Sequence, residues 1–165
     1  MSDDARKLLI VEDDPGLLNQ LKWCFEDYEV FTAEDREQAI AELRRHEPMV
    51  VLQDLGLPPD PGGVSEGFGL LEEVLALAPD TKVIVVTGND ERKNALQAIA
   101  MGAYDFYQKP VDADVLRLLV DRAYNLYALE QVLAPLNVEV MKTTSGVEAL
   151  QLTLAHEFSL AIVDV

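Results

Sequence analysis

Short apolar runs alternate with segments of helical periodicity along the first three quarters of this chain. The runs have strand length and little polar alternation, which is typical of strands buried on both faces of a parallel sheet. Five strands are predicted, over residues 7–11, 29–32, 49–54, 82–86 and 103–107.

Helices are predicted after each of these strands, over residues 15–25, 34–46, 69–77, 91–101 and 112–134. Asp14 before Pro15 favours a helix start, because the carboxylate caps the first turn and proline lacks only an unused N–H. Asn89 or Asp90 is expected to cap the fourth helix, which Gly102 ends. Because strands and helices alternate, we expect an α/β fold with a doubly wound parallel sheet.

Polar side chains follow four of the predicted strands, at the point where each strand ends. They are Glu12, Asp13, Asp54, Thr87 and Lys109. Each alone has an ordinary structural explanation, as a helix-start charge, a cap or a surface residue. The carboxyl ends of the strands in a doubly wound sheet converge on one crevice, so their coincidence predicts a site.

The chemistry of this set favours phosphoryl transfer. Clustered carboxylates repel one another unless a cation neutralises them, and oxygen ligands of this kind suit Mg²⁺. A carboxylate beside such a metal can act as a nucleophile, which makes Asp54 a candidate acceptor. The Lys109 ammonium and the Thr87 hydroxyl are then suited to hold phosphoryl oxygens.

Charge and composition restrict the partners. The chain of 165 residues has 13 Lys and Arg against 30 Asp and Glu, a formal net charge of −17. Such a surface repels nucleic acid and anionic membranes, so we expect no direct nucleic-acid binding and no membrane association. The sequence shows no signal peptide and no membrane-length apolar run, and Cys24 fits a small core residue. A cytoplasmic location is expected.

Four stretches identify a family resemblance. They are Ile10 to Asp14, Asp54 to Pro58, Val85 to Gly88 and Gly102 to Pro110. In order and spacing they resemble the receiver domain of bacterial two-component response regulators. The resemblance implies a flavodoxin-like sheet of order 2-1-3-4-5, with residues 1–124 as the receiver. It implies a signalling module, not an enzyme, in which Asp54 takes a phosphoryl group from a histidine kinase or a phosphotransfer protein.

The resemblance also assigns roles to the individual residues. The Mg²⁺ ligands would be Glu12, Asp13, Asp54 and the backbone carbonyl of Gly56. Lys109 would pair with the phosphoryl group, and the Lys109–Pro110 bond would be cis. Thr87 and Phe106 would form the switch pair, although Phe106 lacks the hydroxyl of the commoner Tyr. Glu12 stands where many members of the family have Asp.

The long Pro- and Gly-rich loop over residues 58–65 most resembles nitrogen-regulator-type activators, including those of exopolysaccharide and exosortase gene clusters. Those proteins continue into an ATPase and a DNA-binding domain. No Gly-rich phosphate loop and no basic recognition helix occurs in this sequence. The output step is therefore expected to lie outside this chain.

Residues 125–165 resemble part of a second receiver. At a constant offset of 110 the identical pairs are Glu29/Glu139, Val30/Val140, Ala39/Ala149, His46/His156, Glu47/Glu157 and Asp54/Asp164. This repeat predicts a helix–strand–helix–strand extension whose first helix is shared with the receiver. A domain that ends inside its central strand favours an engineered fusion or a truncated tandem protein.

The partial repeat has two expected consequences. Without a first strand, its last strand has unpaired edges, so we expect a homodimer formed through residues 112–165. Asp164 has no acidic pair, Thr or Lys of its own, so we expect no phosphorylation there.

Two alternative functions remain open at this level. Haloacid-dehalogenase-type phosphatases also combine a strand-end Asp, a Thr and a Lys with Mg²⁺, but they need an acid two residues after the nucleophile. Gly56 occupies that position, which argues against an enzyme. The other alternative is a non-signalling chimeric scaffold that self-associates through its C-terminal half-receiver.

Overall fold

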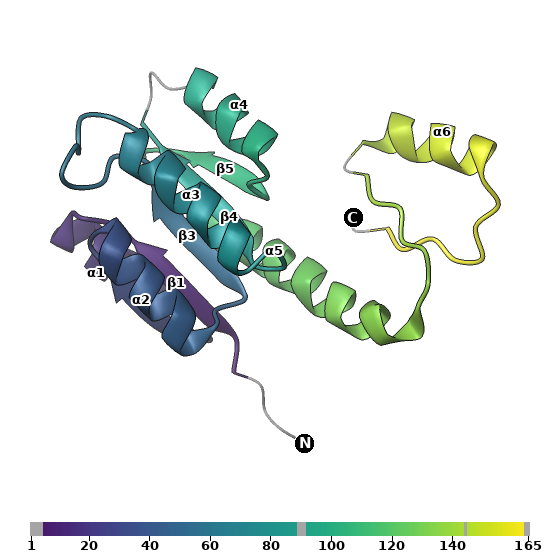
Figure 1. Cartoon of the computed structure of the whole chain (residues 1–165), viewed down its shortest axis with the longest axis horizontal. Helices are drawn as coiled ribbons and strands as arrows, with labels where there is room; N and C mark the ends of the chain where they lie inside the picture. Colours follow the sequence, from purple (N-terminus) through teal and green to yellow (C-terminus); the bar gives the residue numbers. More distant parts are fainter. Residues whose placement is uncertain (1–4, 89–91, 144, 164–165) are drawn as a thin grey trace. The chain divides into compact units, whose positions relative to one another are not determined.

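The computed structural model describes residues 5–88, 92–143 and 145–163. Its centre is a parallel sheet of five strands (Figure 1). They are β1 (Lys7–Val11), β2 (Glu29–Ala33), β3 (Val50–Asp54), β4 (Lys82–Thr87) and β5 (Asp105–Gln108). The strand order is β2-β1-β3-β4-β5, which confirms the predicted topology.

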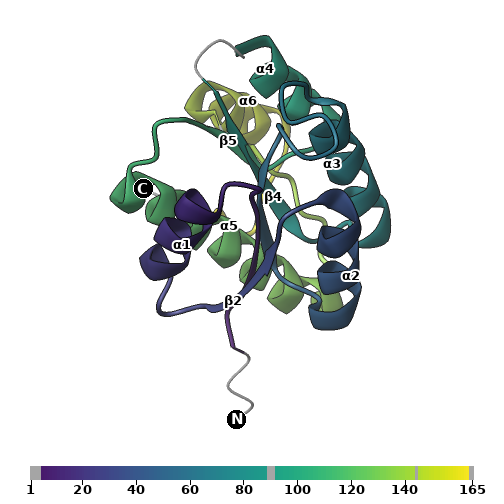
Figure 2. The same cartoon turned by 90° about the vertical axis from the view of Figure 1, so that its left-hand side faces the viewer.

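Five helices connect and follow the strands. They are α1 (Pro15–Cys24), α2 (Arg36–His46), α3 (Ser65–Leu77), α4 (Arg92–Met101) and α5 (Ala113–Leu133). Figure 2 shows α1 and α5 on one face of the sheet and α2 and α3 on the other. The strands β1, β3 and β4 are therefore covered by helices on both faces, which explains why their sequences are apolar without alternation.

Two separate cores result from this layering. Beneath α2, α3 and α4, the strands contribute Leu9, Val11, Val51, Val83 and Val85. Beneath α1 and α5 they contribute Leu8, Ile10, Val50, Leu52, Ile84 and Val86. Successive residues of a strand point to opposite faces, so one apolar run supplies both cores.

Local signals locate most helix ends. The Asp14 side chain accepts from the Leu17 N–H at 2.9 Å, and Pro15 opens α1 as expected. Gly102 ends α4 with a φ of 111°, a conformation that favours glycine. The proposed caps Asn89 and Asp90 lie outside the described residues.

The start of α3 differs from the prediction. The helix begins at Ser65 instead of Gly69, because Gly67 is a helical residue with a packing role. A Cβ at Gly67 would lie 2.4 Å from the Leu55 Cα, so only glycine lets α3 approach β3 this closely. In the sequence the same glycine reads as a helix breaker, which hid the first turn.

The amino-terminal edge of the sheet is tied to α5. The Tyr28 hydroxyl donates to the Asp121 carboxylate at 2.6 Å, and the Arg6 guanidinium lies 4.9 Å from the Tyr124 ring centroid. Further along the helix, Lys82 of β4 pairs with Glu130 at 2.6 Å, with both side chains largely buried. These contacts hold nearly all of α5 against the receiver.

The chain divides into two compact units, residues 1–132 and 133–165. The second contains a 3₁₀ turn, η1 (Ala134–Leu136), and one helix, α6 (Gly146–Ala155). The helix–strand–helix–strand prediction for the extension is wrong in its strands, because no strand forms among the described residues after Gln108. A strand needs a neighbour for its backbone hydrogen bonds, and the repeat lacks the segment equivalent to β1, which pairs with both β2 and β3.

The start of α6 does follow the repeat. Its N-cap Ser145 accepts from the Glu148 N–H, as Asp35 accepts from the Gln38 N–H at the start of α2. Both cap positions are separated by the same offset of 110 residues. Within the described ranges, no helix combines the length and apolarity that crossing a membrane requires.

Candidate functional site

The predicted site residues lie at the carboxyl edge of the sheet. Glu12 follows β1, Asp54 and Thr87 are the last residues of β3 and β4, and Lys109 follows β5. The strand register places Asp54 beside Val86. The Lys109 N–H donates to the Thr87 carbonyl at 2.7 Å, which fixes the end of β5 to that of β4.

Three carboxylates gather at this edge. Single oxygens of Glu12, Asp13 and Asp54 all lie within 4.8 Å of one another. Glu12 is the most buried of the three, at 3% exposed. Its carboxylate accepts from the Asp14 N–H at 3.1 Å, so the backbone of the first loop orients it toward the cluster.

Lys109 joins two of these carboxylates. Its ammonium donates to Asp54 Oδ2 at 2.7 Å and to Glu12 Oε2 at 3.3 Å. The Lys109–Pro110 bond is cis, as the resemblance implied. The cation therefore partly neutralises the cluster and lies directly beside the candidate acceptor.

The electrostatics of the cluster follow from burial and like charge. Burial, followed by the neighbouring Asp54 charge, raises the pKa of Glu12 above its usual value. Burial by itself would lower the pKa of Lys109, but the hydrogen bonds and charges of Asp54 and Glu12 raise it overall. The three carboxylates thus carry more negative charge than the Lys109 ammonium alone can neutralise.

These residues fit a magnesium ion. The set offers hard oxygen ligands on three converging carboxylates, and Mg²⁺ binds through few carboxylates while retaining water. Burial and the Asp54 charge raise the pKa of Glu12, and a divalent cation bound beside these carboxylates would offset both effects.

Glu12→Gln is expected to stabilise the metal-free protein at neutral pH. A raised folded-state pKa means that the folded state binds more protons, so stability falls as pH rises from about 4.5 through the folded-state pKa. Removing the carboxylate should flatten this slope, and urea unfolding in EDTA across that pH range measures it. An unchanged slope would contradict the assignment, and Glu37→Gln on α2 provides the matched surface control.

The remaining predicted residues occupy distinct places. Thr87 is 2% exposed, and Phe106 is half-buried against the core under α2, α3 and α4. The Gly56 N–H donates to Asp54 Oδ1 at 3.2 Å. A Cβ on Gly56 would lie 2.6 Å from the Pro61 carbonyl oxygen, so the loop folds back closely on this residue.

One buried polar residue was missed by the sequence interpretation. Gln53 is fully buried, and its amide donates to the Gly67 carbonyl at 2.8 Å. The available signal was an amide inside an otherwise apolar run. Within that run, the sequence alone does not distinguish Gln53 from the other residues of the strand core.

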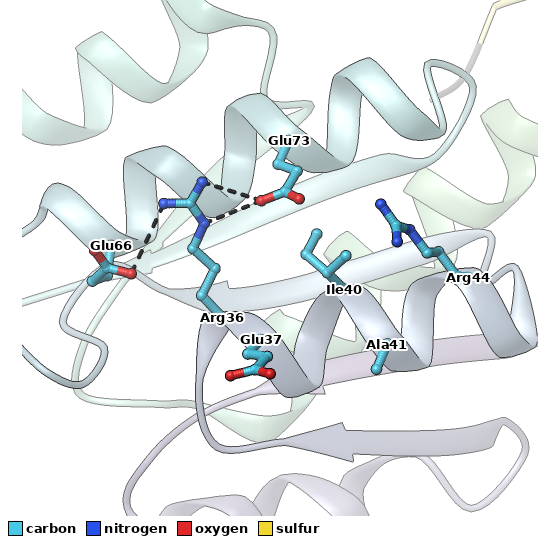
Figure 3. A pocket seen from close by; sticks show the side chains of 7 residues that line it. All are labelled: Arg36, Glu37, Ile40, Ala41, Arg44, Glu66 and Glu73. Atoms are coloured by element: carbon cyan, nitrogen blue, oxygen red, sulfur yellow. Dashed lines mark hydrogen bonds and ion pairs between the residues drawn. The ribbon is translucent and has the colours of Figure 1, made fainter.

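A separate groove lies between α2 and α3, lined by Arg36, Glu37, Ile40, Ala41, Arg44, Glu66 and Glu73 (Figure 3). None of the predicted site residues lines it. The Arg36 guanidinium in this groove bonds to Glu73 and pairs with Glu66, so it serves to connect the two helices.

The chain resembles curated regulators over part of their length. It is 32% identical over 129 residues to the nitrogen assimilation regulatory protein NtrX of Azorhizobium caulinodans, covering 77% of this chain and 28% of that protein. It is 31% identical over 150 residues to the alginate biosynthesis transcriptional regulatory protein AlgB of Pseudomonas aeruginosa, covering 90% and 32%. The chain thus spans about a third of the length of these relatives.

Solved structures agree with these matches. The receiver domain of NtrX from Brucella abortus is 32% identical, with a TM-score of 0.66 over 72% of this chain and 98% of that chain. A receiver domain protein from Clostridium thermocellum is 28% identical, with a TM-score of 0.68 over 74% and 97%. These comparisons lend no support to the alternative of a non-signalling chimeric scaffold.

The sequence profile of the family described as response regulator receiver domain matches residues 8–121. That range contains all of the sheet except Lys7, the first residue of β1, and every residue of the carboxylate and lysine cluster. The chain belongs to the family of response regulator receiver domains.

Proposed function

We propose that Asp54 accepts a phosphoryl group from a histidine kinase or phosphotransfer protein, with Mg²⁺ held by Glu12, Asp13, Asp54 and the Gly56 carbonyl. The observation that carries this proposal is the Lys109 ammonium 2.7 Å from Asp54, within a cluster of three carboxylates. The carboxylates and the ammonium lie together at one edge of the sheet, which supports phosphoryl transfer to Asp54 with Mg²⁺ bound beside it.

The transfer is a displacement at phosphorus. One Asp54 oxygen attacks the phosphorus of the phosphohistidine, and the new O–P bond forms as the N–P bond breaks, with the electron pair left on the imidazole nitrogen. Bound Mg²⁺ would supply positive charge that offsets repulsion between the carboxylates and the phosphoryl oxygens. The Lys109 ammonium then exchanges one carboxylate contact for a phosphoryl oxygen.

The phosphorylated state would be reported through the end of β4 and through β5. The Thr87 hydroxyl is suited to donate to the phosphoryl group, and Phe106 follows by ring packing, since it has no hydroxyl. Leu96 of α4 and Leu118 of α5 are exposed large apolar residues on the helices that flank β5. We assign the switched interaction surface to α4, β5 and α5.

The proposed setting is cytoplasmic, where kinases of this class deliver the phosphoryl group. The relatives named above are described as regulatory proteins, one of them of transcription. The net charge of −17 argues against direct contact of these residues with nucleic acid.

The test is uptake of one phosphoryl group from a small phosphodonor, followed by the intact mass of the protein. Uptake should require Mg²⁺ and stop in excess EDTA. Failure to gain mass in Mg²⁺ would refute the proposed function.

We also propose that the second unit forms a dimer with a second copy of this chain. Its exposed large apolar residues include Val147, Leu150 and Leu154, at helical spacing on α6, and Leu160 and Ile162 beyond it. Exposed apolar side chains of this kind would be covered where the second units of two copies meet.

Leu154→Glu is expected to weaken this dimer at least tenfold, because a carboxylate would be buried in an apolar contact. Light scattering over a range of protein concentrations measures the association. Leu77→Glu at the end of α3 is the matched control, with the same change at an exposed leucine outside residues 112–165 and outside the surface of α4, β5 and α5. Monomeric mass of the unmodified chain at high concentration, or equal loss in the control, would contradict the assignment.

A further inference from the structure

Gln53 places an amide on a side of β3 that faces the apolar core. Its side chain is fully buried, immediately before Asp54. Val51 and Leu55, which share its side of the strand, both belong to the core under α2 and α3.

Only one end of this amide is satisfied. Nε2 donates to the Gly67 carbonyl of α3 at 2.8 Å, whereas Oε1 has no hydrogen-bond partner among the described residues. An unpaired buried carbonyl oxygen costs free energy, so an apolar side chain of the same length would suit stability better. A residue that violates the core pattern in this way is expected near function.

The amide bond closes the loop that follows Asp54. That loop leaves β3 at Leu55, returns to α3 at Ser65, and contains Gly56, whose N–H donates to the Asp54 carboxylate. The Gln53–Gly67 bond spans its two ends. Close contact between Gly67 and the Leu55 backbone reinforces the same junction.

The first turns of α3 are also held from their other side. Arg36 of α2 bonds to Glu73 at 3.1 Å and pairs with Glu66 at 3.9 Å (Figure 3). Because these contacts hold α3 to α2, a change at the junction with β3 would be accommodated in the loop that contains Gly56.

We infer that Gln53 is a positioning residue for the Mg²⁺ and phosphoryl-transfer site, acting through Gly67 and the loop to place Gly56 beside Asp54. The inference rests on the proposed function. It assigns a role to a residue outside the ligand set and predicts opposite effects on stability and on metal affinity.

Gln53→Met tests this role, because methionine has similar length and removes both polar ends. Calorimetric titration with MgCl₂ should give a dissociation constant about tenfold higher, with a thermal midpoint that is unchanged or raised. Thr81→Val is the matched control: Thr81 is also buried and donates to a backbone carbonyl, that of Pro48 at 3.0 Å, at the opposite edge of the sheet. It should lower the midpoint and leave Mg²⁺ affinity unchanged.

An Mg²⁺ dissociation constant within twofold of the unmodified protein would overturn the inference. Equal weakening in Thr81→Val would do the same, since it would indicate general loosening. If Gln53→Met and a second variant, Gln53→Leu, both fail to fold, the amide is structural and the inference also fails. If the unmodified chain binds no Mg²⁺ and takes up no phosphoryl group, the proposed function falls together with it.

Discussion

Asp54→Asn is expected to abolish phosphoryl uptake completely. An amide cannot supply the carboxylate oxygen that forms the acyl phosphate. The protein should remain folded, because the change removes one of three carboxylates within 4.8 Å of one another. Intact mass after incubation with Mg²⁺ and a small phosphodonor measures the loss.

Asp60→Asn is the matched control, since Asp60 is an exposed carboxylate in the loop that follows Asp54. It should take up one group, as the unmodified chain does. Residual uptake in Asp54→Asn would refute Asp54 as the sole acceptor. Two groups on the unmodified chain would implicate Asp164, which lies outside the described residues and which we predict is not phosphorylated.

Lys109→Met is expected to slow phosphoryl uptake by about 10²- to 10³-fold, the usual effect of removing one donor to a developing oxyanion. The same change should strengthen Mg²⁺ binding, because the ammonium at 2.7 Å from Asp54 and 3.3 Å from Glu12 opposes a second cation electrostatically. Uptake kinetics by mass and calorimetric titration with MgCl₂ separate the two effects.

Lys22→Met removes the same charge from an exposed position on α1. Neither rate nor Mg²⁺ affinity should change in this control. Uptake by Lys109→Met at the unmodified rate would exclude the proposed contact with the phosphoryl group, whatever happens to the metal.

Local patterns predicted the sheet well because each strand carries its own signal. The run that ends at Asp54 is apolar because helices cover both faces, and the Asp14–Pro15 pair marks the start of α1 through its own cap. The family motifs then predicted which polar residues meet. These features depend on neighbours in sequence or on a shared edge of the sheet.

Features that depend on distant partners were missed. Gly67 reads as a helix breaker until β3 is placed beside it, and the buried amide of Gln53 has meaning only with α3 in position. The repeat after residue 125 predicted strands from similarity to β2 and β3, but a ladder requires the intervening strand. The cap of α6 is local and therefore follows the repeat. The strands do not form, because the segment equivalent to β1 is missing from the repeat.

The attachment of α5 affects how such domains can be exchanged between proteins. The family match ends at residue 121, yet Tyr124 contacts Arg6 and Glu130 pairs with Lys82, beyond that limit. A fusion made at residue 121 would remove Glu130 and leave the Lys82 ammonium, whose side chain is 13% exposed, without this carboxylate partner. The unit that must be exchanged intact therefore extends to about residue 132. A fusion to another domain is best joined after α5.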